Sequence, residues 1–429
     1  MAENTPLASE TPAPLVCVIA HSHPDFSHGG GELAAHRQFL TMRTAGRPAV
    51  FVGACEVGST YALSRPIETV LPHAPAEFVY SFAGMAEDRL GWDDPYQRRV
   101  MVDFLAGLGA DVYHFHHYWR VGVDLIADLM EARPEARFVM TMHDMLAICL
   151  NHGQMVKTRS RELCRQESPL RCLACFPDQT LERFAFRKAA LIAVLQRLDQ
   201  VIYPSEIVRA RYEAWGLTAP RAMVLENYLG DDNLALPRLG AVVPAMAARF
   251  GFFGQPTAFK GLDVLLRAFP LALRERPEIT LTIHGAERDD ALRLFPTLAS
   301  AVEAAGQNLS FAGRYDPLAA VPLMRAVGWV VVPSLWWENS PVVIQEARRA
   351  GTPLIVSDIG GMAEKTLRDV DGLHFNRASP IDLARAMVEA ADPATRARLG
   401  GSLRDVMGRE EFLTGLDAAF APRATPPIG

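Results

Sequence analysis

Short apolar segments with the residue types of β-strands alternate along this chain with helix-length amphipathic segments. In the first half, the strand-like segments begin at Leu15, Val112, Arg137 and Gln200. In the second half, the alternation resumes with RFGFFG, ITLTIHG, LSFAG, WVVVPS and PLIVS. Such alternation is typical of a parallel sheet that is covered by helices on both faces. The sequence therefore predicts an α/β fold with two doubly wound parallel-sheet domains.

The length of the chain agrees with two domains, because 429 residues exceed the roughly 250 to 300 residues that one hydrophobic core supports. A weakly periodic segment rich in Gly, Pro and Asp follows Asn227 and is the best candidate for a linker. The N-terminus lacks the basic and apolar regions of a signal peptide. The predicted division is a disordered leader over 1–14, an N-terminal domain over 15–230, a linker over 231–245, a C-terminal domain over 246–410 and a tail over 411–429 that packs back on the N-terminal domain.

Charge and hydropathy exclude several classes of protein. The net charge of -6 gives no basic field for nucleic acid, and no apolar run approaches the roughly 18 residues of a membrane span. We therefore expect a cytoplasmic protein that at most contacts a membrane peripherally. Residues 151–200 nevertheless hold nine basic and five acidic side chains, a local balance of +4. This segment is either a solvated basic face or a contact for anionic lipid or a diphosphate-lipid acceptor.

The most informative loop follows the strand-like segment WVVVPS. It carries Glu338, Asn339 and Ser340, and Pro341 then begins a helix with Ser340 as the expected N-cap. Glu346 lies in the second turn of that helix. Carboxylates accept pairs of hydrogen bonds from neighbouring hydroxyls, and a helix N-terminus offers unpaired N–H groups to an anion. The pattern indicates a site for a polyhydroxyl ligand, although a solvated loop charge and a surface helix residue would look the same in isolation.

The spacing of Glu338 and Glu346 resembles the E-x7-E signature of retaining glycosyltransferases of family 4, which have the GT-B fold. The segments FFGQPTAFKGLDVLLRAF, QVIYPSEIVRARYEAWG and SDIGGMAE extend this resemblance over most of the chain. It implies two Rossmann-like domains that face each other across a cleft. It also implies transfer of a sugar from a UDP- or GDP-sugar to a glycan or lipid-linked acceptor, with retention of anomeric configuration. A nucleotide-sugar epimerase of the same fold and a non-catalytic nucleotide-sugar-binding protein are the alternatives.

The resemblance assigns roles to individual residues. It implies that Glu338 contacts hydroxyls of the donor sugar, that Glu346 binds the nucleotide ribose, and that Lys260 neutralises the diphosphate. Gln255 stands where the family commonly has Arg, so this chain has one fixed positive charge fewer for the leaving group. No catalytic cofactor is implied. The residues expected to bind the donor are Gly30, Gly31, Gln255, Arg314, Asn339, Ser340, Pro341 and Glu346, and those expected to be catalytic are His143, Lys260 and Glu338.

Two features of the N-terminal half fit the same cleft. Gly29, Gly30 and Gly31 stand between a strand and a helix, where glycines let the backbone approach a ligand closely. His143 and Asp144 follow the strand-like segment RFVMTM and resemble the family's His-Asp pair, which implies that His143 hydrogen-bonds the donor sugar. A flexible glycine turn and a packed histidine are the structural alternatives.

A cysteine-bearing segment, an insertion over about 149–178, follows that His-Asp pair; a subset of the family has a similar one. A C-x-x-C pair and two separate cysteines can provide four thiolates for a tetrahedral structural zinc. Reduced cysteines packed under a loop, a disulfide or a redox role are the alternatives. These cysteines are Cys149, Cys164, Cys172 and Cys175. The nearby His114, His116 and His117 also suggest a metal, but no further ligand is evident in the sequence.

Overall fold

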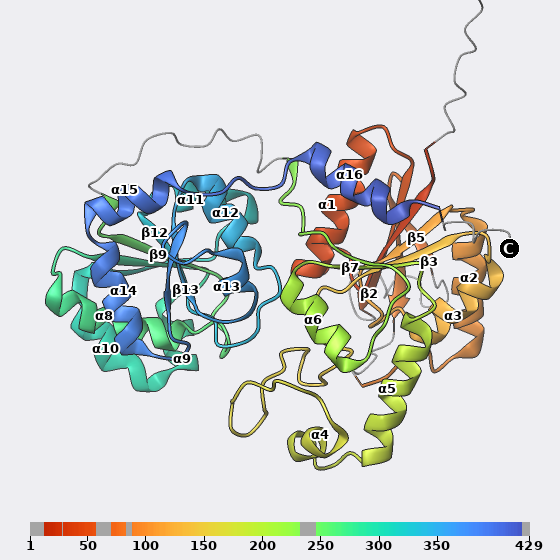
Figure 1. Ribbon diagram of the computed structural model, residues 1–429, viewed down its shortest axis with the longest axis horizontal. Coiled ribbons are helices and arrows are strands. Elements are labelled where there is room, and N and C mark those ends of the chain that lie inside the picture. The colour runs from red at the N-terminus through yellow and green to blue at the C-terminus, as the bar shows by residue number, and fades with distance from the viewer. Residues whose placement is uncertain (1–12, 28, 57–69, 83–87, 232–245, 423–429) are drawn as a thin grey trace, which may run out of the picture.

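Two sheet domains lie side by side in the computed structural model, which describes residues 13–27, 29–56, 70–82, 88–231 and 246–422 (Figure 1). Both domains are parallel sheets covered by helices, so the predicted α/β fold is confirmed. Most of the predicted leader, and the predicted linker apart from Asp231, lie outside the described residues. Among the described helices, none is both long and apolar enough to cross a membrane.

The N-terminal domain contains an eight-stranded sheet in the order β3-β4-β2-β1-β5-β6-β7-β8. Its strands are β1 (Val16–Ala20), β2 (Ala49–Glu56), β3 (Val70–Ala74), β4 (Glu77–Phe82), β5 (Val112–Phe115), β6 (Arg137–Thr141), β7 (Gln200–Tyr203) and β8 (Ala222–Val224). Its helices are α1 (Gly30–Thr44), α2 (Pro95–Gly107), α3 (Val123–Ala132), α4 (Pro169–Cys175), α5 (Leu181–Leu195) and α6 (Glu206–Trp215). Among the described strands of this sheet, the edge strand β3 pairs antiparallel with β4, and the other pairs are parallel.

The C-terminal domain contains a six-stranded parallel sheet in the order β11-β10-β9-β12-β13-β14. Its strands are β9 (Arg249–Phe253), β10 (Thr280–His284), β11 (Leu309–Gly313), β12 (Trp329–Val332), β13 (Leu354–Ser357) and β14 (Gly372–Phe375). The helices of this half are α8 (Leu262–Glu275), α9 (Arg288–Leu294), α10 (Ala299–Ala305), α11 (Ala320–Met324), α12 (Val342–Ala350), α13 (Gly360–Lys365), α14 (Pro380–Ala390), α15 (Pro393–Gly401) and α16 (Arg409–Phe420).

The last helix, α16, crosses back and packs on the N-terminal domain (Figure 1). Its buried Phe412, Leu416 and Phe420 belong to the same hydrophobic cluster as Val16 and Val18 of β1. The Phe412 ring also stacks on Tyr228 with 4.9 Å between the ring centroids. The two domains are thus joined twice, once by the chain after β8 and once by α16.

Candidate active site

Glu338 is buried at the carboxyl end of β12, where three donors converge on one of its oxygens. Its Oε1 atom lies 2.7 Å from Nζ of Lys260 and accepts hydrogen bonds from Ser334 Oγ at 2.8 Å and Trp336 Nε1 at 3.0 Å. The side chain of Glu338 is only 7% exposed, whereas that of Lys260 is 37% exposed. The carboxylate is therefore held in one orientation, and the ammonium group reaches solvent beside it.

Two glycines bring the backbone segments of this ion pair together. Gly261, which precedes α8, has φ of +70°, and a Cβ atom there would lie 1.8 Å from the carbonyl oxygen of Pro333. A Cβ atom on Gly361 would lie 1.9 Å from the carbonyl oxygen of Asn339. Only glycine fits such close approaches of backbone to backbone. These contacts explain locally why glycine follows Lys260 and why a glycine pair follows β13.

A cavity of about 750 Å³ brings together three residues that the sequence assigned to the donor: Gln255, Arg314 and Glu346. The C-terminal domain supplies most of its wall, and Leu33 of α1 in the N-terminal domain completes it. The remaining lining residues are Gly254, Pro256, Gly285, Asp290, Arg293, Leu294, Tyr315, Pro317 and Ala320. The sequence did not predict that Arg293 and Tyr315 line this cavity, although Tyr315 directly follows Arg314, which it did predict.

Burial dominates the electrostatics of Glu346. Desolvation raises the pKa of Glu346 to about 7, and the nearby charge of Arg37 opposes this shift. Burial also raises the pKa of Tyr315 above its ordinary value, with a smaller contribution from the charge of Glu346. The wall of the cavity therefore holds a carboxyl group that is about half ionised at neutral pH and a neutral phenol.

His143, the glycine loop and the Glu338 loop meet between the domains. A Cβ atom on Gly31 would lie 3.6 Å from the side chain of His143, and the amide group of Asn339 donates a hydrogen bond to the carbonyl oxygen of His143. Burial, followed by the charges of His21 and His117, lowers the pKa of His143 to about 3. The His143 ring is therefore neutral in this setting.

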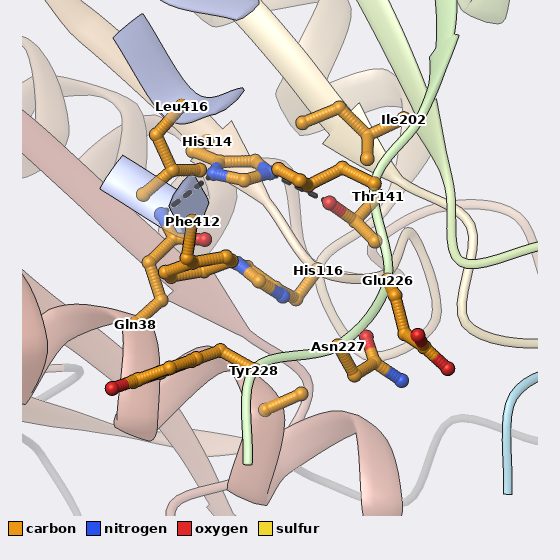
Figure 2. A pocket seen from close by; sticks show the side chains of 12 residues that line it. Gln38, His114, His116, Thr141, Ile202, Glu226, Asn227, Tyr228, Phe412 and Leu416 are labelled. Carbon is orange, nitrogen blue, oxygen red and sulfur yellow. Dashed lines mark hydrogen bonds between the residues drawn. The ribbon is translucent and has the colours of Figure 1, made fainter. Parts of the chain in front are cut away.

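A buried histidine network adjoins His143, and Figure 2 shows its members His114 and His116. His114 is 2.8 Å from both Gln38 and Thr141, one at each ring nitrogen, so both nitrogens are occupied by hydrogen bonds. Nδ1 of His116 lies 2.8 Å from Nε2 of His143. The adjacent cavity measures only about 20 Å³, which is far too small for a sugar. His114 and His116 are packed, hydrogen-bonded side chains, and His116 holds the His143 ring.

The expected N-cap at Ser340 is wrong. Helix α12 begins at Val342 with Pro341 in the N-cap position, because Pro341 has the extended ψ angle of 119°. The Ser340 hydroxyl instead donates to Oε1 of Glu226 at 3.0 Å. Asn339 and Ser340 thus contact the N-terminal domain: Asn339 links the Glu338 loop to His143 after β6, and Ser340 links it to Glu226 after β8.

The cysteine segment contacts the C-terminal domain. The carbonyl oxygen of Cys164 accepts a hydrogen bond from Trp337 Nε1 at 3.2 Å, and Arg211 stacks over the Trp337 ring at 4.0 Å. The four cysteines carry free thiols, and among the described residues no three of these thiols lie within 4.8 Å of one another. Burial raises the pKa of Cys149 to about 11. A structural zinc at these cysteines stays a prediction.

The comparisons with known proteins bear on both domains. Residues 247–392 match the family described as glycosyl transferases group 1. Phosphatidyl-myo-inositol mannosyltransferase of Mycobacterium tuberculosis is 29% identical over 42% of this chain and 45% of its own length. D-inositol 3-phosphate glycosyltransferase of Thermobispora bispora is 26% identical over 67% of this chain and 63% of its own length. The chain thus spans about half the length of the first of these relatives and somewhat more of the second.

Solved glycosyltransferase structures share the fold over almost the whole chain. Sucrose-phosphate synthase from Thermosynechococcus elongatus superposes with a TM-score of 0.65 and 18% identity, covering 95% of both chains. HepE of Anabaena, in complex with UDP and glucose, superposes with a TM-score of 0.61 and 16% identity, also covering 95% of both chains. The architecture of this chain is the GT-B fold, as the sequence resemblance implied. Its C-terminal domain is similar to the group 1 glycosyl transferases.

Proposed function

We propose that this protein is a glycosyltransferase that moves a sugar from a nucleotide-diphosphate-sugar to a glycan or lipid-linked acceptor, with retention at the anomeric carbon. The observation that carries the proposal is the arrangement of the E-x7-E residues. Glu346 lines a cavity of about 750 Å³, and Glu338, eight residues earlier, pairs with Lys260 where two segments of the C-terminal domain meet. The group 1 family match over residues 247–392 supports the same activity.

The reaction needs no protein nucleophile in this proposal. The bond between the anomeric carbon and the diphosphate oxygen breaks as a bond from the acceptor oxygen forms on the same face. The acceptor proton passes to the departing diphosphate. Lys260 neutralises the charge that develops on the diphosphate, Glu338 accepts hydrogen bonds from sugar hydroxyls, and His143 orients the sugar from the N-terminal domain.

The lining of the cavity indicates where the donor nucleotide binds. Glu346 would accept the ribose hydroxyls, and Arg314 and Arg293 add positive charge to a wall where Gln255 is neutral. A bound UDP in the structure of HepE supports a uridine nucleotide here, and a GDP-mannose-dependent mannosyltransferase of Corynebacterium glutamicum, 29% identical over 34% of this chain, keeps a GDP-sugar as the other donor to test.

A lipid-linked acceptor is supported by the unit formed by α4 and α5, residues 169–195. This unit projects from the N-terminal domain (Figure 1). Leu170 is 72% exposed and Phe186 is 71% exposed, and Arg165, Arg171 and Arg183 are also exposed. Apolar side chains among arginines suit the surface of an anionic membrane. The enzyme would then act in the cytoplasm at the inner face of a membrane.

The decisive experiment separates transfer from its alternatives. The purified protein is incubated with each of a panel of UDP- and GDP-sugars, with and without extracts that contain lipid or glycan acceptors. A transferase releases nucleoside diphosphate and forms a glycoside only when an acceptor is present. An epimer formed from donor alone would identify an epimerase, and donor binding without either product would identify a binding protein.

A further inference from the structure

A second group of ionisable side chains lies in the N-terminal domain and includes none of the residues assigned to the donor. His23 follows β1, His36 lies on α1 and Glu77 begins β4. Nε2 of His23 and Nε2 of His36 each lie 2.9 Å from the same oxygen, Oε2 of Glu77. One potential ligand atom from each of the three residues falls within 4.8 Å of the other two. Two imidazoles and one carboxylate are a common ligand set for divalent transition metals.

A third imidazole and a second carboxylate adjoin this group. His73 of β3 places Nε2 at 2.6 Å from Oδ2 of Asp25, and its ring centroid lies 4.4 Å from that of His23. The atom Oδ2 of Asp25 lies 3.7 Å from Nδ1 of His23. His23, Asp25 and His73 form a second group with ligand atoms within 4.8 Å of one another. His23 belongs to both groups and is their centre.

The surroundings fix these rings in place. His23 is only 2% exposed, and the Phe51 ring meets the His23 and His36 rings edge-on at 5.5 and 5.1 Å. A Cβ atom on Gly53 would lie 3.0 Å from the backbone nitrogen of His23, so β2 presses closely on this loop. A rigid apolar setting that aims ligand atoms at one point is what a metal site requires.

Hydrogen bonds also satisfy both ring nitrogens of His23 without a metal. The backbone N–H of Asp25 donates to Nδ1 of His23 at 3.2 Å, which leaves the proton of His23 on Nε2 to bond Glu77. A metal on Nε2 would require the other tautomer, with the proton on Nδ1. The exposed carboxylate of Asp25, whose Oδ2 lies 3.7 Å from Nδ1 of His23, could accept a hydrogen bond from that proton after a small rotation. Metal-bound histidines are usually held by such a carboxylate.

We infer that His23, His36 and Glu77 bind a divalent transition metal of the zinc class, with Asp25 orienting His23 and His73 beside the site. The metal would clamp three elements together: the loop after β1, helix α1 and the hairpin of β3 and β4. The same loop leads to α1, whose first turn holds Gly31 near His143. The site is independent of the cysteine segment and of the proposed sugar transfer.

The test uses the full chain, stripped with a chelator and titrated with Co²⁺ and Zn²⁺. We expect one equivalent to bind, with cobalt absorption that lacks the thiolate charge-transfer band. His36→Gln and Glu77→Gln should each weaken this binding by more than the roughly 10- to 100-fold that loss of an outer-shell partner costs, because each removes a direct ligand. His374→Gln is the matched control, because His374 pairs with the single carboxylate of Asp358 at 3.0 Å and should bind metal like the wild type.

Three further measurements make the outcome decisive. When all four cysteines of the segment are replaced by serine, the protein should still bind the one equivalent of Co²⁺ whose absorption lacks the thiolate charge-transfer band. Zinc should raise the thermal midpoint of the wild type and of His374→Gln, but not of the two ligand variants. Should those variants fail to fold, X-ray absorption of the cobalt-loaded variant that lacks the four cysteines must show nitrogen and oxygen ligands only. Wild-type affinity in both folded ligand variants, sulfur ligation of the only bound ion, or no binding at all would overturn the assignment.

Discussion

Nζ of Lys260 lies 2.7 Å from Oε1 of Glu338, although the two residues are 78 positions apart in the sequence. The pair joins the loop after β9 to the loop after β12, and these strands are neighbours in the sheet. The carboxylate holds the lysine at the end of the sheet while Ser334 and Trp336 hold the carboxylate. In the proposed function, this one ion pair would place both a cation for the diphosphate and an acceptor for the sugar hydroxyls.

Replacing either member of this pair should abolish transfer and leave the fold intact. In the proposed mechanism, Lys260→Ala removes the positive charge that neutralises the leaving diphosphate. Glu338→Gln replaces the carboxylate that accepts hydrogen bonds from the sugar hydroxyls by a weaker amide acceptor. We expect the rate of nucleoside diphosphate release to fall about 100-fold or more in each variant, as when one oriented donor is removed from an active site. Initial rates at saturating donor measure this.

The control for these variants is Arg209→Ala, which breaks an ion pair of similar length, 2.8 Å to Glu213, on the exposed side of α6. Its rate should match the wild type. The thermal midpoint of Arg209→Ala should be close to that of the wild type, since an exposed ion pair contributes little stability. Lys260→Ala and Glu338→Gln disturb a buried carboxylate and should lower the midpoint, so circular dichroism must show both variants folded at the assay temperature. Turnover near the wild-type rate in Lys260→Ala or Glu338→Gln would remove both residues from the mechanism.

The buried Glu346 predicts a pH dependence of stability. The pKa of Glu346 is about 7 in the folded protein, against an ordinary value of 4.5. Below pH 4.5 the carboxyl group is protonated in both the folded and the unfolded chain, so it costs no stability. Above pH 7 it is ionised in both, and the folded state carries the full cost of burying the charge. Relative to Glu346→Gln, the free energy of unfolding of the wild type should fall by on the order of 3 kcal/mol as pH rises between these values. Urea unfolding of both proteins at pH 4.5, 6 and 8 checks this, and parallel curves would contradict it.

The same group predicts the pH dependence of donor binding. In the proposed function an ionised Glu346 would accept both ribose hydroxyls, so nucleotide affinity of the wild type should increase as pH rises through 7. In Glu346→Gln the affinity should be lower and independent of pH over that range. Isothermal titration calorimetry with the nucleoside diphosphate measures the affinity of both proteins at each pH. If the affinity of Glu346→Gln depended on pH as that of the wild type does, a group other than Glu346 would be responsible.

The sequence located the strands and loops that carry the site, because buried parallel strands such as β12 consist of apolar residues. It did not predict which loop residues would meet. The contact of Asn339 with His143 joins positions 196 apart, and the distance between them depends on how the domains pack. Ser340 has the residue type of an N-cap, but Glu226, from the other domain, takes its hydroxyl. Tertiary contacts overrode the local preference.

The cluster of His23, His36 and Glu77 shows the same limit. His23 and Glu77 are 54 positions apart, with no motif spacing to connect them, and only the pairing of β4 beside β2 brings Glu77 under α1. For the cysteines the spacing in the sequence suggested one site, and the zinc expected there stays a prediction: Cys149, Cys164 and Cys175 lie near enough for their charges to interact.

Gln255 offers a test by gain of function. Gln255 lines the cavity at a position where the glycosyltransferase family that this chain resembles commonly has Arg. Arg293 and Arg314 line the same cavity. Gln255→Arg should strengthen binding of the nucleoside diphosphate about 10-fold, which corresponds to a charge-assisted hydrogen bond of about 1.5 kcal/mol. The gain should shrink as salt concentration rises. Gln255→Met, which has similar length and no charge, should show no gain; equal gains in both variants would mean that packing, not charge, limits binding.

The exposed apolar residues of the α4–α5 unit predict contact with an anionic membrane. Leu170→Ser and Phe186→Ser should each reduce sedimentation of the protein with vesicles that contain phosphatidylglycerol, because a buried apolar side chain contributes about 1.5 to 3 kcal/mol. Binding of the wild type should also weaken at high salt, since the exposed arginines contribute through charge.

Ile381 provides the matched control, because it is 62% exposed on α14 of the other domain. Ile381→Ser should bind vesicles like the wild type, and vesicles of phosphatidylcholine alone should bind none of these proteins strongly. If Leu170→Ser and Phe186→Ser sediment as well as Ile381→Ser, the unit does not face a membrane. Its exposed side chains would then be free to contact a glycan or protein instead, and transfer to a water-soluble acceptor should proceed without vesicles.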